Sequence, residues 1–167
     1  MGNIMNAHLR LSIRYMLMGL ISFTLGYYIN LWIYPSTALL GGMWSVISGV
    51  IVIEADSWKQ NLSTAKNRLI GSCIGGVIAT VYLWVIPFHI ISFAFLIGLT
   101  AFVCSLCHVT QHIKLACVTF SVIIIVSTMS DVNPFQNASM RFLESGIGIA
   151  SALLVSKLMT SFLAPPE

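Results

Sequence analysis

The chain has 167 residues, of which 57% are hydrophobic and only 8% are charged. Because a soluble domain carries about 25% charged residues, this composition excludes a soluble globular protein and predicts an integral membrane protein. The formal net charge of +3 is too small and too dispersed along the chain to indicate a nucleic-acid partner.

Prolines and charged residues divide the chain into six apolar segments, and a membrane-spanning helix needs about 20 such residues. The predicted helices cover residues 11–32, 37–53, 68–85, 89–107, 115–128 and 140–162. A polar connection over residues 54–67 separates the second helix from the third, and a loop over residues 130–139 precedes the sixth. The sequence therefore predicts a single-domain, all-α membrane protein with six transmembrane helices.

The distribution of positive charge predicts the orientation of these helices. An even number of spans places both termini on the same side of the membrane. Only Arg141 falls on the opposite side, whereas seven cations fall on the side of the termini: Arg10, Arg14, Lys59, Lys66, Arg68, Lys114 and Lys157. Since cytoplasmic segments carry an excess of Lys and Arg, both termini are predicted to be cytoplasmic, in a bacterial inner membrane.

The sequence around Arg68 resembles that around Arg141, 73 residues later, and a glycine follows each arginine after seven residues. This similarity predicts two three-helix repeats, over about residues 11–86 and 88–163. An odd number of spans in each repeat inverts the second copy in the membrane, an arrangement found in many transporters. The similarity is short, so coincidence remains the alternative.

Arg68 and Arg141 open the predicted third and sixth helices, so inverted repeats would put one arginine at each mouth of a pathway. Guanidinium groups bind carboxylates through paired hydrogen bonds, and helix N-termini add positive potential. Lys66 would help Arg68 to attract anions. Each arginine also has a structural explanation, since Arg68 obeys the positive-inside rule and Arg141 can pair with Glu144 one turn later.

Three further residues complete the predicted substrate site. Trp44 and Phe120 are expected to line the apolar middle of the pathway. Glu54 ends the predicted second helix, where a single carboxylate is better explained as a partner of Arg68 or Lys66 than as a proton relay. No catalytic triad, phosphate-binding loop or pair of catalytic carboxylates can be assembled, so neither enzyme activity nor a cofactor is predicted.

The stretch from Met43 to Gly76 carries the most specific pattern in the chain. It consists of Met43-Trp44-Ser45-Val46, Val50-Ile51-Val52-Ile53-Glu54, Leu62 and Lys66-Asn67-Arg68-Leu69-Ile70-Gly71-Ser72. This pattern resembles the signature of the fusaric-acid-resistance and aromatic acid exporter superfamily, which plant aluminium-activated malate transporters share. It departs from that signature at Ser72, where threonine is usual, and in a slightly longer polar connection.

The resemblance implies a six-helix membrane domain, usually oligomeric, that passes organic anions, with Arg68 and Arg141 facing the anion. Family members commonly carry a large soluble domain after the helices, whereas this sequence ends at Glu167. The expected function is therefore transport of small organic anions such as aromatic carboxylates, by a homodimer or higher homo-oligomer in the lipid bilayer.

Two alternatives remain open at the level of sequence. The first is a membrane scaffold or accessory subunit of an export assembly, which the small number of polar groups within the apolar segments favours. The second is transition-metal transport, because the spacing of Cys104, His108 and His112 puts three potential ligands on one face of a helix.

Overall fold

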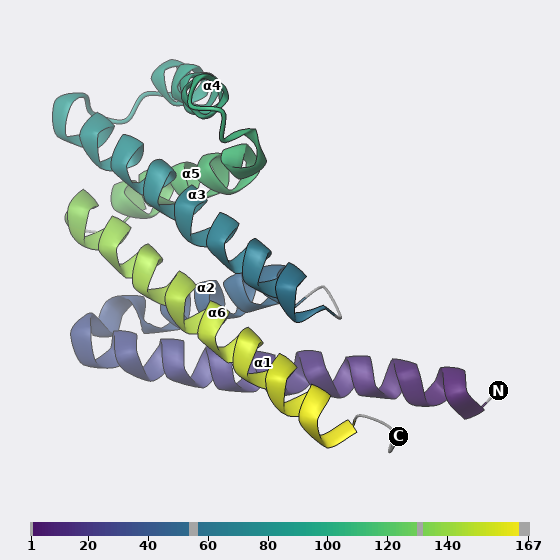
Figure 1. Cartoon of the computed structure of the whole chain (residues 1–167). Helices are drawn as coiled ribbons and strands as arrows, with labels where there is room; N and C mark the ends of the chain where they lie inside the picture. The colour runs from purple at the N-terminus through teal and green to yellow at the C-terminus, as the bar shows by residue number, and fades with distance from the viewer. Residues whose placement is uncertain (1, 54–56, 130–131, 164–167) are drawn as a thin grey trace. The chain divides into compact units, whose positions relative to one another are not determined.

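The computed structural model describes residues 2–53, 57–129 and 132–163, and the regular structure within these ranges is entirely helical. Its elements are α1 (Gly2–Ile33), η1 (Pro35–Thr37), α2 (Ala38–Val52), α3 (Trp58–Val85), α4 (Ile90–Leu106), η2 (Thr110–His112), α5 (Ile113–Met129) and α6 (Pro134–Leu163). Within these ranges, five helical segments are long and apolar enough to cross a membrane, and α4 is a shorter apolar helix of 17 residues. The predicted all-helical fold class is confirmed for these residues (Figure 1).

Three of the helices begin at least six residues earlier in the chain than predicted, and the first of them is α1, which begins at Gly2 instead of residue 11. α3 begins at Trp58 instead of residue 68, and α6 begins at Pro134 instead of residue 140. Pro134 fits the first turn of α6, where a missing backbone N–H leaves no intrahelical hydrogen bond unmade. The side-chain oxygen of Asn133 caps this turn by accepting a hydrogen bond from the backbone N–H of Phe135 at 2.9 Å.

The start of α3 was wrongly predicted because its charged residues were interpreted as a connection. Lys59, Gln60 and Lys66 are good helix formers, and their charges do not interrupt a helix that extends beyond the apolar segment. The backbone N–H of Asn61 donates to the carbonyl oxygen of Ser57 at 3.0 Å, which closes the first turn. Residues 58–67, which are ten of the fourteen residues in the predicted polar connection, are therefore helical.

The chain forms two compact units. Unit 1 comprises the residues up to Ala65 and those from Glu144 onward, and unit 2 comprises Lys66–Leu143. Unit 1 thus holds α1, α2, the first residues of α3 and most of α6. Unit 2 holds the rest of α3, α4, α5 and the first residues of α6.

In unit 1, α1 and α2 pack against each other as a helical hairpin (Figure 1). Pro35 opens the short η1 turn between them, because its fixed φ angle suits a first helical position. The two backbones approach closely, since a Cβ atom at Gly26 of α1 would lie 2.7 Å from the carbonyl oxygen of Gly41 of α2. Asn30 reinforces the end of α1 by donating to the carbonyl oxygen of Gly26 at 2.8 Å.

The second close contact in unit 1 joins α2 to α6. Gly148 of α6 faces the backbone of α2, where an added Cβ atom would lie 2.8 Å from the nitrogen of Gly49 and 2.9 Å from Cβ of Ser48. Ser48 also donates a long hydrogen bond of 3.4 Å to Ser145. Small residues allow two helix backbones to touch in this way, as is common inside membranes.

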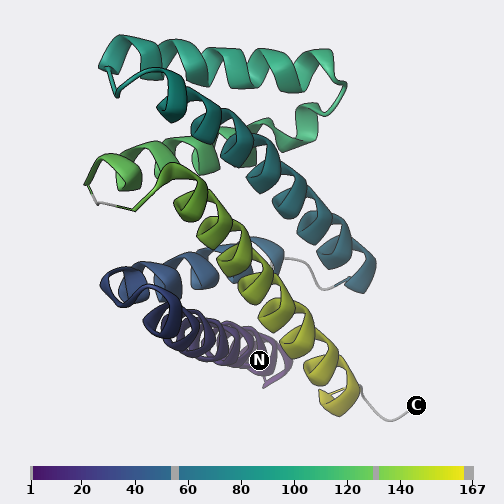
Figure 2. The same cartoon turned by 90° about the vertical axis from the view of Figure 1, so that its left-hand side faces the viewer.

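In unit 2, α3 crosses α5 at two glycines (Figure 2). A Cβ atom at Gly71 would lie 2.6 Å from Cβ of Leu115, and one at Gly75 would lie 2.9 Å from the nitrogen of Phe120. Beside this crossing lies a hydrophobic core whose buried members are Ala79, Tyr82, Phe120, Ile123 and Ile124. α4 packs on α5, where the ring of Phe93 stacks on that of Phe120 with centroids 5.8 Å apart.

Candidate functional site

Arg68 was predicted at the beginning of its helix, but it lies inside α3. It follows Trp58, the first residue of α3, by ten residues, or about 15 Å of helix at 1.5 Å per residue. Because the potential of a helix terminus falls off within its first turn, the N-terminus of α3 adds nothing to the charge of Arg68. The side chain is only 3% exposed.

The face of α3 that carries Arg68 continues toward α5. Ser72 follows Arg68 by one turn on this face, is 3% exposed, and accepts a hydrogen bond of 3.5 Å from Thr119 of α5. One residue before Ser72, a Cβ atom at Gly71 would lie 3.3 Å from the carbonyl oxygen of His112. His112 itself is 2% exposed. Arg68 therefore stands at one end of a buried polar strip between α3 and α5.

Arg141 likewise lies within its helix, seven residues after Pro134, and is 4% exposed. Asn137, one turn earlier on the same face of α6, donates to the carbonyl oxygen of Ile123 at 3.1 Å and to Ser127 at 2.9 Å. These two bonds fix the start of α6 against the end of α5. They also orient the next turn of α6, so Arg141 lies on a rigidly held part of this helix.

Glu144 follows Arg141 by three residues on the same face of α6 and is fully buried, with 0% exposure. Opposite charges at this spacing on a helix attract each other, and the pairing of Arg141 with Glu144 stays a prediction. Among the residues described, four formally charged side chains are buried: Arg14, Arg68, Arg141 and Glu144. Taking an ion out of water costs several kcal/mol, so ionisable groups buried in membrane helices generally mark a site that uses them.

The other predicted site residues have different surroundings. Lys66 is exposed, and because positions two apart point to nearly opposite sides of a helix, it does not share the face of Arg68. Trp44 is half-buried on α2. Phe120 is 0% exposed and belongs to the hydrophobic core of unit 2, which favours a packing role over the predicted lining role. Glu54 lies outside the described residues.

The predicted helical face of metal ligands is wrong. Cys104 is buried in α4, which ends at Leu106, whereas His108 is exposed in the following turn with a positive φ of 56°. His112 belongs to the separate turn η2. In the part of the chain that the structure describes, no three His, Cys, Asp or Glu side chains gather as metal ligands would.

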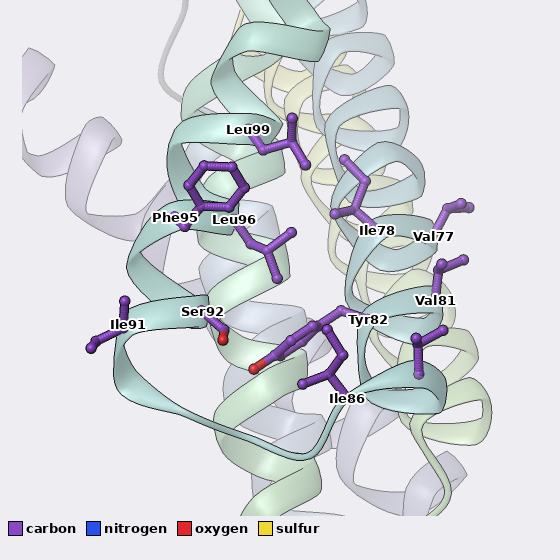
Figure 3. A pocket seen from close by; sticks show the side chains of 11 residues that line it. Val77, Ile78, Val81, Tyr82, Ile86, Ile91, Ser92, Phe95, Leu96 and Leu99 are labelled. Atoms are coloured by element: carbon purple, nitrogen blue, oxygen red, sulfur yellow. The ribbon is translucent and has the colours of Figure 1, made fainter.

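A groove in unit 2 was not predicted from the sequence. It has a volume of about 640 Å³ and is lined by side chains of α3, α4 and the turn between them: Val77, Ile78, Val81, Tyr82, Val85, Ile86, Ile91, Ser92, Phe95, Leu96 and Leu99 (Figure 3). The hydroxyl of Tyr82 donates to the carbonyl oxygen of Pro87 at 3.3 Å and accepts from the N–H of His89 at 3.2 Å. The groove thus offers an almost wholly apolar surface, and none of its lining residues is charged.

Comparison with known protein families decides how these helices are interpreted. Residues 16–155 match the family described as fusaric acid resistance protein-like. The chain belongs to this family. Together with the apolar helices, this membership makes the chain a multi-pass membrane protein and suggests membrane transport or export as its function. Neither a curated protein nor a solved structure gives a significant match.

Arg68, Arg141 and Glu144 all fall within the matched residues of the fusaric acid resistance protein-like family, as do Trp44 and Phe120. Arg14 lies two residues before the match and Ser156 one residue after it. The buried charges of α3 and α6 are therefore part of the segment by which the family is recognised.

Proposed function

We propose that this protein transports small organic anions, such as aromatic carboxylates, across the membrane, and that Arg68 and Arg141 bind the carboxylate. The observation that carries the proposal is the burial of both guanidinium groups, 3% and 4% exposed, within long apolar helices. A guanidinium offers paired hydrogen bonds that match the two oxygens of a carboxylate. In a site shielded from water these bonds are stronger than at a surface.

Glu144 supports this assignment by limiting the positive charge of the site. Its carboxylate is buried one turn from Arg141 on the same helix, so it attracts the Arg141 guanidinium and competes with an incoming anion. Such competition weakens anion binding, and a transport site must release its substrate as well as bind it. Arg68 would then bind the anion more tightly than Arg141 does.

The proposal includes the membrane arrangement. The protein would lie in a bacterial inner membrane with cytoplasmic termini, as the excess of cations on that side favours. The two halves would be inverted repeats, so Arg68 and Arg141 would serve opposite sides of the membrane. Two or more copies would assemble as a homo-oligomer.

The test measures uptake of radiolabelled benzoate by liposomes that contain the purified protein. Arg68→Ala and Arg141→Ala are expected to reduce benzoate flux at least about tenfold, because each loses a charge-assisted bond to the carboxylate. Lys66→Ala is the matched control, since it removes a cation from the same helix but from an exposed position. Folding is checked by helical circular dichroism and by elution on size exclusion.

Unchanged benzoate flux in both arginine variants, or an equal loss in Lys66→Ala, would refute the assignment of these residues. A wild-type protein that carries no organic anion and copurifies from native membranes with a stoichiometric partner would favour the scaffold function instead.

A further inference from the structure

Three side chains that are far apart in the sequence meet in unit 1. Arg14 of α1 donates from Nη2 to the hydroxyl oxygen of Ser156 in α6 at 3.0 Å. Asn61 of α3 donates from Nδ2 to the same oxygen at 3.3 Å. Arg14 is 8% exposed, Asn61 is 1% exposed and Ser156 is 8% exposed. Three helices therefore bring a guanidinium, an amide and a hydroxyl together around one buried atom.

This cluster lies near the ends of the apolar spans that supply it. Arg14 follows the beginning of the span His8–Ile33 by six residues, or about 9 Å of helix. Asn61 follows the beginning of the span Trp58–Val85 by three residues. Ser156 precedes the end of the span Pro134–Met159 by three residues. The cluster is therefore expected at the depth where lipid headgroups meet the hydrocarbon.

Further residues around the cluster suit such a depth. Arg10 precedes Arg14 by one helical turn, Lys59 precedes Asn61 by two residues, and Lys157 is next to Ser156; all three cations are exposed. Trp58 at the start of α3 is 47% exposed, and tryptophan is enriched at membrane–water interfaces. One buried guanidinium thus lies among three exposed cations.

We propose that Arg14, Asn61 and Ser156 form a binding site for the phosphate of an anionic phospholipid headgroup. A guanidinium, an amide and a hydroxyl are all hydrogen-bond donors to phosphate oxygens, and the bond from the charged guanidinium is the strongest of the three. The exposed cations attract the anionic headgroup to this end of unit 1, as clusters of basic residues beside a membrane do. The site is independent of the proposed transport activity, and Arg14 and Ser156 lie outside the residues matched by the family.

Native mass spectrometry of the purified full chain tests this site with dioleoyl phosphatidylglycerol as the probe. Wild-type protein is expected to bind one lipid per chain at this site, and Arg14→Gln to bind it about tenfold more weakly because a charge-assisted hydrogen bond is lost. Ser156→Ala leaves the net charge unchanged and is also expected to weaken binding. Should Arg14→Gln fail to fold, Ser156→Ala decides the matter.

Lys114→Gln is the control, because it removes one exposed cation from unit 2 and leaves the cluster intact. Its affinity for the lipid is expected to equal that of wild type. Equal affinity in wild type and Ser156→Ala, or a loss in Lys114→Gln as large as in the cluster variants, would overturn the proposal. A second arm titrates inorganic phosphate, and phosphate binding that depends on Arg14 without any phosphatidylglycerol binding would overturn the lipid as its source.

Discussion

Unit 1 and unit 2 both bring helices together at glycines, yet they fill the space around these contacts differently. Unit 2 buries aromatic side chains, Tyr82 and Phe120, next to the glycine crossing of α3 and α5. Of the seven serines that are buried in the described chain, six belong to unit 1 and only Ser72 to unit 2. The six are Ser22, Ser45, Ser48, Ser145, Ser151 and Ser156.

This difference follows from how helices associate in lipid. Lipid tails are as apolar as leucine, so helix association depends on close packing and on hydrogen bonds between helices. Unit 1 achieves close packing with backbones that nearly touch, which small residues such as glycine and serine permit. Unit 2 adds large rings that fill the volume between α3, α4 and α5. The two units therefore respond differently to the removal of a side chain and to the addition of one.

Removal of the Phe120 ring is expected to have the largest effect. Phe120→Ala leaves a cavity beside Tyr82 and Ile123, and the loss of packing contacts should destabilise the protein by about 3 kcal/mol. Thermal unfolding in detergent, followed by circular dichroism, measures the change. Phe95→Ala is the control, because Phe95 is 70% exposed on α4 and should change stability by less than about 0.5 kcal/mol. Equal effects would show that unit 2 does not depend on its aromatic core.

Addition of a methyl group at the crossing glycines is expected to have the next largest effect, in both units. Gly148→Ala and Gly75→Ala each force a Cβ atom into the backbone of a neighbouring helix, which no side-chain rotation relieves. We expect each to destabilise the protein by about 2 kcal/mol in the same unfolding assay, since overpacking outweighs the gain in helix propensity.

Two other glycines provide controls for this prediction. Gly146 in α6 and Gly98 in α4 have nothing within 4 Å of an added Cβ atom. Gly146→Ala and Gly98→Ala should therefore leave stability unchanged or raise it by up to about 1 kcal/mol, as expected for alanine in a helix. If alanine were tolerated at Gly148 but not at Gly75, the close backbone contact would matter only in unit 2.

The smallest expected effects come from polar side chains at the contacts. Asn137→Ala in unit 2 removes two hydrogen bonds, of 3.1 and 2.9 Å, and should cost about 1 to 2 kcal/mol. Ser48→Ala in unit 1 removes a long bond of 3.4 Å to Ser145 and should cost less than Asn137→Ala. Unfolding of both variants side by side in one detergent measures the difference. A larger cost for Ser48→Ala would mean that the serines of unit 1 stabilise the helix contacts through hydrogen bonds and not only through their small size.

The sequence predicted three of the helices well, α2, α4 and α5, because their boundaries are marked by prolines or by abrupt changes in hydropathy. α4 was predicted at residues 89–107 and found at Ile90–Leu106, and α2 was predicted at residues 37–53 and found at Ala38–Val52. The beginning of α6 was predicted too late, because Pro134 was interpreted as part of the preceding loop. A proline ends a helix in one context and begins it in another. Only the neighbouring Asn133 cap distinguishes the two cases.

The candidate site was only partly predictable, because the beginnings of α3 and α6 were wrongly predicted. Arg68 and Arg141 stand out in the sequence because charges are rare in apolar helices, and the structure does bury both. Their predicted position at helix starts was wrong, since α3 and α6 begin ten and seven residues earlier. Phe120 was assigned to a pathway lining, but hydrophobicity alone does not distinguish a lining residue from a core residue.

The amino-acid sequence by itself determined that the chain is helical and embedded in a membrane, because composition and the spacing of apolar runs suffice for that inference. It also carried the pattern of its family. Only the tertiary structure decided which faces of the helices meet. Arg14, Asn61 and Ser156 illustrate this, since 142 residues separate Arg14 from Ser156 and 95 separate Asn61 from Ser156. Helical periodicity says which residues share a face, whereas packing alone selects the helix that this face contacts.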